Sequence, residues 1–275
     1  MRLAPSKTMM RRLSAAALGG SQSRSVVPAK QISCAGCAGM FPYMLGVVSS
    51  LQERFGASVA RDVEAIGGAS AGTFGALLLA TGVSSKRLHF DAHLDLVRSV
   101  AAAGGPLLRW NDMVFDGFLA YLDDAAPDAF ARASDRLFVS LSEVTASGIS
   151  KARKSRFVSN EDLVDSMIAS SFVPFAYSAR PPYCFHASRL DGTYYVDASV
   201  QDPKPTPLPL DSHPRLVLHH RMFRADLPLV APISCDVALV EERYAMGYED
   251  AEAHAGQLAA RFNKVADDDS DRRAA

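Results

Sequence analysis

A serine between small residues is the clearest candidate for chemistry in this chain. Gly68-Ala69-Ser70-Ala71-Gly72 matches the pattern G-x-S-x-G, in which the serine occupies a sharp turn between a strand and a helix. Gly68 and Gly72 permit the strained backbone of such a turn. The following helix directs its positive N-terminal end at the serine, which favours developing negative charge. We therefore expect Ser70 to be a nucleophile, although a tight turn with an inert serine has the same pattern.

A serine hydroxyl needs a general base and an oxyanion hole before it can attack a carbonyl group. The chain has seven histidines, and the order Ser…Asp…His would be completed by His213 or a later one. Nothing around these histidines singles one out. Asp197 follows a β-prone run, 194–196, which would hold it rigidly. On its residues alone, however, Asp197 is more simply interpreted as a turn aspartate that caps local N–H groups.

The elements around Ser70 alternate between strand and helix. Strand, turn and helix are predicted in succession at 31–33, 34–39 and 41–55, and again at 63–66, 67–72 and 73–81. The two helices follow from apolar residues at helical spacing. Two consecutive strand–turn–helix units favour an α/β sheet with parallel strands.

The rest of the chain is predicted to be mixed. Helices are expected within 86–124, interrupted at 102–106, and over 160–170. Strands are expected at 137–141, 157–158, 194–196 and 215–219. The run 236–264 predicts a long final helix that is broken near Gly247, because glycine weakens a helix interior.

Three segments, taken in order, resemble one known family. They are Ile32 to Gly39, Gly67 to Gly72, and Ser159 through Ala169-Ser170-Ser171-Phe172-Val173-Pro174 to Tyr195-Val196-Asp197-Ala198-Ser199. They are similar to the glycine-rich oxyanion loop, the nucleophile elbow and the aspartate block of the patatin-like phospholipases. Their order and spacing match over about residues 31–202, with the triacylglycerol lipase branch as the nearest in appearance, and 247–251 is similar to the closing helix.

This resemblance implies a Ser-Asp dyad without histidine. Ser70 would be the nucleophile and Asp197 the base, and the backbone N–H groups of Gly36, Cys37 and Ala38 would form the oxyanion hole. An aspartate shielded from water accepts a hydroxyl proton more readily than an exposed one. The implied fold is a three-layer α/β/α domain with a mostly parallel central sheet and a serine elbow.

The implied activity is hydrolysis of acyl ester bonds in glycerolipids through an acyl-enzyme. Triacylglycerol, phospholipid and lysophospholipid are the implied substrates, with a weak preference for neutral lipid, and no metal or organic cofactor is implied. Acyl transfer to an alcohol would use the same site. Several apolar residues suit either an acyl chain or a protein core, and for most of them the core is the simpler interpretation: Met40, Phe41, Met44, Phe172 and Phe175.

Some positions depart from the family pattern. Ala38 and Phe41 stand where the family usually has glycine, and a positive φ is unfavourable for both residue types. Asp197-Ala198 replaces Asp-Gly, and Asp202-Pro203 replaces the usual Asn and Pro. These departures leave a second hypothesis open, in which the protein is a catalytically impaired lipid-binding or regulatory relative.

Cys34-Ala35-Gly36-Cys37 also resembles a thioredoxin-type redox turn. The flanking sequence does not predict a thioredoxin fold, and Ser70 would have no role. A zinc site would need two more ligands, whereas Cys184 and Cys235 are scattered. The simpler interpretation is that Cys34 and Cys37 fill a tight loop, with oxidative inhibition as a further hypothesis.

Charge and composition set the remaining expectations. Residues 1–30 are basic, Ser-rich and free of acids, which is typical of a plastid or mitochondrial transit peptide but also of a disordered basic tail. Residues 31–264 are expected to form the patatin-like domain, and 265–275 a disordered polar tail. The net charge of −1 gives no argument for nucleic-acid binding.

Contact with lipid is expected to be peripheral. The sequence lacks the run of ~20 apolar residues that a spanning helix needs, so we expect the chain to meet a membrane or lipid droplet from its surface. Four cysteines in 275 residues favour a reducing, intracellular compartment. The sequence identifies no protein partner.

Overall fold

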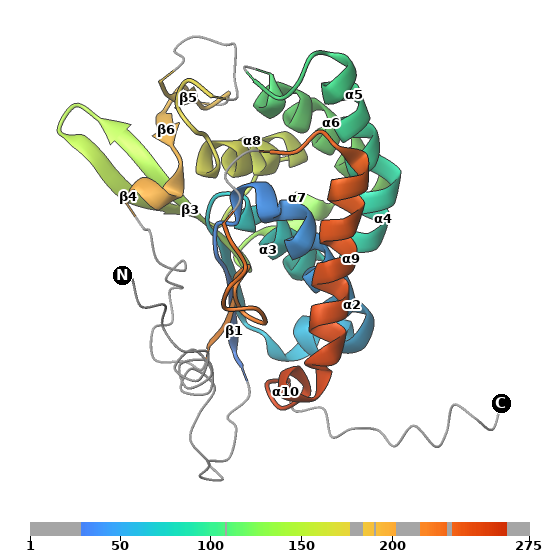
Figure 1. Cartoon of the computed structure of the whole chain (residues 1–275). Coiled ribbons are helices and arrows are strands. Elements are labelled where there is room, and N and C mark those ends of the chain that lie inside the picture. The colour runs from blue at the N-terminus through green and yellow to red at the C-terminus, as the bar shows by residue number, and fades with distance from the viewer. Residues whose placement is uncertain are drawn as a thin grey trace, which may run out of the picture.

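The computed structural model of the chain describes residues 29–107, 109–176, 184–189, 191–201, 215–229 and 233–262. Several of the features named above lie outside the described residues: the basic segment up to residue 28, the tail 265–275, His213 and Asp202-Pro203. Figure 1 shows a central sheet with helices packed along it.

The described residues contain one seven-stranded sheet with a parallel centre. Four parallel strands lie in the order β7 (Arg215–Leu218), β1 (Gln31–Cys34), β2 (Ala65–Gly68) and β3 (Leu137–Thr145). Three antiparallel strands extend it, namely β4 (Gly148–Lys154) and β6 (Tyr194–Val196) beside β3, and β5 (His186–Ala187) beside β6. The predicted α/β class with a mostly parallel central sheet flanked by helices is confirmed.

The two central strands are short and completely buried. Every residue of β1 and β2 is buried, and Cys34 at the end of β1 pairs with Gly68 at the end of β2. Because the strands are parallel, the loops that follow them emerge at the same edge of the sheet. The Ala69 N–H donates to the Cys34 carbonyl over 3.1 Å, and the Ala35 N–H donates to the Leu218 carbonyl over 2.9 Å. This edge is where open α/β sheets bind ligands.

Helices α2 (Phe41–Asp62), α3 (Gly72–Thr81) and α9 (Val237–Ala253) form the main helical layer. All ten residues of α3 are buried, because it packs against β2 and α2. Figure 1 shows α9 alongside α2. Their backbones meet at two glycines: a Cβ on Gly46 would lie 2.0 Å from the Tyr244 carbonyl oxygen, and one on Gly247 would lie 2.0 Å from that of Tyr43.

The predicted break near Gly247 is therefore wrong. Helix α9 continues through this residue, which serves close helix packing. The chain changes direction at His254 instead, before the short helix α10 (Ala255–Ala259).

Most of the remaining helices lie above and to the right of β1 in Figure 1. They are α4 (Ser85–Arg87), the π-helical turn η2 (Leu88–His93), α5 (Leu94–Ala102), α6 (Trp110–Ala125), α7 (Ala129–Ala133) and α8 (Asn160–Ser170). Helix α8 packs against both β3 and α6, which brings its C-terminal end close to the edge of the sheet that carries Ser70. Two 3-10 turns, η1 (Ala38–Met40) and η3 (Ala198–Val200), complete the described elements.

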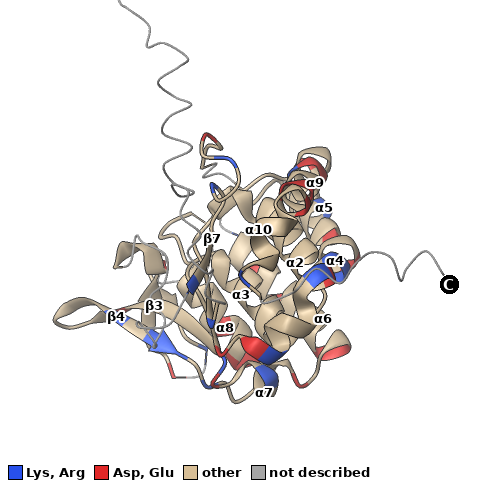
Figure 2. Cartoon of the chain, turned by 90° about the horizontal axis from the view of Figure 1, so that it is seen from below, with Lys and Arg blue, Asp and Glu red and all other residues tan. Residues whose placement is uncertain are grey.

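The prediction of a strand at 157–158 is wrong, and the strand that the sequence did not predict here is β4, which pairs with β3. Residues 148–151 and 153 of β4 are exposed, so β4 lacks the apolar alternation that marks a half-buried strand. Figure 2 shows basic residues on this strand. Two predicted boundaries also differ from the structure. The helix predicted at 41–55 extends to Asp62 as α2, and the strand predicted at 63–66 begins at Ala65 as β2.

Candidate active site

Ser70 lies on a sharp turn between β2 and α3. Its φ is 51°, in the left-handed region that non-glycine residues seldom adopt. Its N–H donates to the Ser170 hydroxyl oxygen over 2.9 Å, and that hydroxyl in turn donates to the Ser140 carbonyl over 2.7 Å. The strained turn is therefore held by a serine at the end of α8, which is itself bonded to β3.

The two glycines of the motif are required by crowding around this turn. A Cβ on Gly68 would lie 2.5 Å from the Thr73 Cα. One on Gly72 would lie 2.4 Å from the carbonyl oxygens of both Cys34 and Ala35. Any side chain at either position would displace the backbone that carries Ser70.

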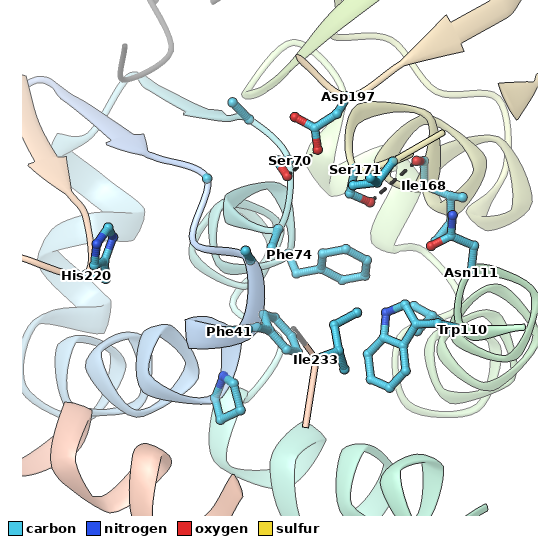
Figure 3. A pocket seen from close by; sticks show the side chains of 18 of the residues that line it. Phe41, Ser70, Phe74, Trp110, Asn111, Ile168, Ser171, Asp197, His220 and Ile233 are labelled. Atoms are coloured by element: carbon cyan, nitrogen blue, oxygen red, sulfur yellow. Dashed lines mark hydrogen bonds between the residues drawn. The ribbon is translucent and has the colours of Figure 1, made fainter. Parts of the chain in front are cut away.

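Ser70 and Asp197 are in direct contact (Figure 3). The Ser70 hydroxyl donates to Oδ2 of Asp197 over 2.6 Å. Asp197 follows β6, is 7% exposed, and its N–H donates to the Phe172 carbonyl over 2.8 Å. The other carboxylate oxygen, Oδ1, accepts from the Ser199 N–H over 2.9 Å and from the Ser199 hydroxyl. Ser199 therefore fixes the carboxylate so that Oδ2 faces Ser70.

Histidine has no part in this contact within the described residues. Neither the Ser70 hydroxyl nor the Asp197 carboxylate bonds to an imidazole there. His219 and His220 lie on the wall of the same cavity. His254 lies elsewhere, stacked on Phe223.

Two further histidines form a buried pair on the π-helical turn. His89 and His93 share a hydrogen bond between their Nδ1 atoms of 3.1 Å, and His93 also borders the cavity. Burial lowers the pKa of His89 to about 4 and that of His93 to about 3. Both rings are consequently neutral at physiological pH.

The loop between β1 and α2 presses against Ser70. A Cβ on Gly36 would lie 3.1 Å from the Ser70 Cβ and 3.8 Å from its Oγ. Within the described part of the chain, the backbone N–H groups of Gly36, Cys37 and Ala38 donate to no other group. This arrangement leaves free donors beside the serine, as an oxyanion hole requires.

Ala38 and Phe41, which stand where the family usually has glycine, differ in backbone conformation. Ala38 has a φ of 44° and so occupies the left-handed region that favours glycine. Phe41 has a φ of −52° and is the first residue of α2, where its backbone is ordinary. Only Ala38 carries the strain expected from the missing glycines.

An apolar cavity of about 920 Å³ opens beside the dyad. Figure 3 shows Phe41, Phe74, Trp110 and Ile233 lining it, with Ser70 and Asp197 at its edge. Pockets of 300–1,000 Å³ commonly hold small ligands, and this lining suits an acyl chain.

Of the five apolar residues that the sequence offered for an acyl chain, only Phe41 is among the described lining residues. Met40, Met44 and Phe172 are buried in the core, and Phe175 is 67% exposed.

The redox interpretation of Cys34 and Cys37 does not fit the structure. Both side chains are 0% exposed, and both are free thiols. Burial raises the pKa of the Cys37 thiol to about 12 and raises that of Cys34 further. A redox-active cysteine needs a low pKa and access, so these two residues act as small core side chains. In the part of the chain that the structure describes, no group of three or more potential metal ligands comes together.

Four functional candidates emerge only from the structure. Ser170 and Ser199 lie within the motifs, but their bonds to Ser70 and Asp197 are visible only in three dimensions. Asn111 and Arg243 line the cavity from α6 and α9. Each is a single polar residue in a helix, and no local sequence signal marks it.

None of the described helices is both long and apolar enough to cross a bilayer.

Comparison with known proteins places these features in a family context. Over 178 residues, 63% of this chain, it is 31% identical to "Patatin-like phospholipase domain-containing protein 2" of Rattus norvegicus. It is 27% identical to "1-acylglycerol-3-phosphate O-acyltransferase Pnpla3" of Mus musculus over 179 residues, again 63% of this chain. The matches span 34% and 40% of those two proteins. No family model matches the chain.

Among solved structures, VipD from Legionella pneumophila aligns with a TM-score of 0.39 and 15% identity, covering 69% of this chain and 49% of that one. The sequence matches confirm the resemblance to patatin-like phospholipases that the three motifs indicated.

Proposed function

We propose that this protein is a serine hydrolase that cleaves acyl esters of glycerolipids by a Ser-Asp dyad. The observation that carries the proposal is the 2.6 Å hydrogen bond from Ser70 to Asp197 at the edge of a large apolar cavity. A serine on a strained turn, a buried carboxylate and free N–H donors are the parts that acyl transfer needs.

The proposed reaction has two halves. The Ser70 oxygen attacks the ester carbonyl carbon while its proton passes to Oδ2 of Asp197. The carbonyl oxygen becomes an oxyanion that accepts hydrogen bonds from the N–H groups of Gly36, Cys37 and Ala38. The intermediate then expels the alcohol, which takes the proton from Asp197, and leaves an acyl ester on Ser70. Water then attacks this ester by the same steps, releases the fatty acid and restores the Ser70 hydroxyl.

The lipid substrate is supported by the cavity and by the relatives. The apolar lining provides a place for an acyl chain, and the relatives are named as a phospholipase-domain protein and an acylglycerol-phosphate acyltransferase. We also propose that the protein reaches its substrate from the surface of a membrane or droplet.

Acyl transfer is a second candidate because one relative is named as an acyltransferase. The same acyl-enzyme would react with an alcohol in place of water. The other alternative, an impaired lipid-binding protein, is disfavoured by the contact between Ser70 and Asp197 and by the helical backbone of Phe41.

The test is release of fatty acid from triacylglycerol, phospholipid and lysophospholipid by purified protein, with and without an alcohol acceptor. The proposal expects fatty acid from at least one ester with wild type and none with Ser70→Ala. Acylated acceptor in place of fatty acid would assign the transferase activity. Equal activity in wild type and Ser70→Ala would overturn the proposal.

A further inference from the structure

One positive charge beside the oxyanion loop has no role in the proposed hydrolysis. Arg243, on α9, is only 9% exposed and borders the cavity. Its Nη1 donates to the Gly39 carbonyl over 2.8 Å. Among the described residues no carboxylate lies within ion-pair distance of its guanidinium. A buried cation without a counter-ion is costly, so an anion at this position would be strongly favoured.

The same side of the cavity holds more basic groups. Arg221, His219 and His220 follow β7, and all three border the cavity. Strand β7 meets the oxyanion loop where Ala35 donates to Leu218, so this segment and Arg243 adjoin the same loop. Asp197 is the sole acid among the described lining residues. The cavity wall around the loop is therefore cationic, whatever the protonation of the histidines.

His220 and Arg243 also have hydrogen-bonding groups without a protein partner in the described structure, which favours an anionic ligand. Both ring nitrogens of His220 are buried without a partner in the described structure. Arg243 has five N–H donors, and its hydrogen bond to the Gly39 carbonyl uses one of them. A guanidinium with free donors binds phosphate in a forked geometry that lysine lacks.

The arrangement around Ser70 indicates which part of a substrate would lie here. Figure 3 shows Trp110 and Asn111 on one side of the cavity and His220 on the other, with Ser70 between them. An ester held at Ser70 would extend its acyl chain along the apolar side. Its alcohol portion would then face the basic side.

We propose that the wall formed by Arg243, Arg221 and His220 binds the anionic head group of the ester substrate. The ligand class is an acylated glycerol that carries a phosphate close to the scissile ester. This inference rests on the proposed hydrolase function and refines it, because it replaces neutral lipid with an anionic phosphate ester as the preferred substrate.

The kinetic test uses two short-chain esters that remain monomeric, octanoyl-glycerol phosphate and octanoyl-glycerol, so that surface charge of lipid aggregates does not contribute. Wild type is expected to prefer the phosphate ester. Arg243→Met should lower the ratio of the two kcat/KM values about tenfold or more, in line with the loss of a charge-assisted hydrogen bond. Arg221→Met should lower the ratio less, and Arg243→Lys should keep part of it.

Arg98→Met is the matched control. Arg98 lies on α5, pairs with Asp95 and does not border the cavity, so its loss removes the same charge elsewhere. The ratio should not change. If Arg243→Met lowers both kcat/KM values equally, Arg243 only positions the loop through Gly39, and the proposal is overturned.

A binding measurement separates this proposal from the hydrolase function. Ser70→Ala protein is titrated with octanoyl-glycerol phosphate, octanoyl-glycerol, octanoate and inorganic phosphate, with and without Arg243→Met. The proposal expects tightest binding of the phosphate ester and its loss in the double variant, even if no ester is ever hydrolysed. Hydrolysis without any preference for phosphate would refute the subsite alone. Inorganic phosphate or octanoate binding as tightly as the phosphate ester would also refute it.

Discussion

The Ser70 hydroxyl and the Asp197 carboxylate meet at 2.6 Å although 127 positions separate them in the chain. The sheet brings them together: Ser70 follows β2, Asp197 follows β6, and both strands pair with β3. Strand β3 therefore sets the distance between the two groups. Because the Ser170 hydroxyl joins the Ser70 N–H to the Ser140 carbonyl of β3, the turn is tied to the same strand.

Replacing Gly36 with alanine should damage the site without unfolding the protein. The new Cβ would lie 3.1 Å from the Ser70 Cβ, so the loop or the serine must shift by a few tenths of an ångström. We expect ester hydrolysis to fall about 100-fold, as it does when an oxyanion donor is lost, with a nearly unchanged free energy of unfolding.

Gly56→Ala is the control for that substitution. Gly56 lies in α2 with open space around its Cβ position. The alanine should stabilise the helix by about 0.5–1 kcal/mol and leave activity unchanged. Full activity in Gly36→Ala would show that the loop does not act at Ser70.

Ala38→Gly tests whether the departure from the family pattern weakens the protein. With a φ of 44°, Ala38 bears a steric penalty that glycine would not. Glycine also raises the entropy of the unfolded chain, so stability should change little, while activity is retained or raised. Ala38→Val should be strongly destabilised, since a β-branched residue fits this region poorly. Equal melting temperatures and activities for the glycine and valine variants would contradict this account.

The buried thiols should resist oxidation in the native protein. Burial raises the pKa of Cys34 and Cys37, so both remain protonated and unreactive near pH 7, whereas Cys184 and Cys235 are partly exposed. A soluble aromatic disulfide should modify only Cys184 and Cys235, as mapped by mass spectrometry, and activity should persist. Denaturant should expose all four. A Cys34–Cys37 disulfide formed in the native protein, with thiol-reversible loss of activity, would restore the redox hypothesis.

The histidine pair predicts a stability that falls in mild acid. The pKa values of His89 and His93 are lowered to about 4 and about 3 in the folded protein, against about 6.5 in an unfolded chain. Between these values the unfolded state binds more protons, so stability is lost as the pH falls from about 6.5 towards 4. Each histidine contributes at most about 1.4 kcal/mol per pH unit.

Urea unfolding at several pH values measures this dependence. His93→Gln removes one titrating group, so the slope of stability against pH should be shallower than in wild type. Carboxylates contribute equally to both proteins and cancel in the comparison. An unchanged slope would show that His93 does not titrate between the two states as described.

The structural features that the sequence predicts correctly are those determined by short-range patterns of residues. The turn at Ser70, the strands around it and the long helices follow from glycine spacing and apolar periodicity, and Asp197 was placed only by family resemblance. The break predicted at Gly247 is wrong because a glycine that allows two helices to touch has the same local sequence as one that breaks a helix. The exposed strand β4 has no sequence signal because its residues lack apolar alternation.

Long-range contacts are the part that the sequence leaves open. Arg243 bonds to a carbonyl 204 positions away, and no local pattern records such a contact. The backbone of Phe41 was also ambiguous, because only the structure shows that α2 already begins there. The free N–H groups of the oxyanion loop likewise depend on what surrounds the loop.

The central claim is that Ser70 is a nucleophile activated by Asp197, and its most direct test is covalent labelling with a fluorophosphonate probe. Wild type, Ser70→Ala and Asp197→Asn are compared, with folding checked by circular dichroism. The account predicts rapid labelling of wild type at Ser70, none in Ser70→Ala, and strongly slowed labelling in Asp197→Asn. A folded wild-type protein that stays unlabelled, or an Asp197→Asn variant that labels at the wild-type rate, would contradict it.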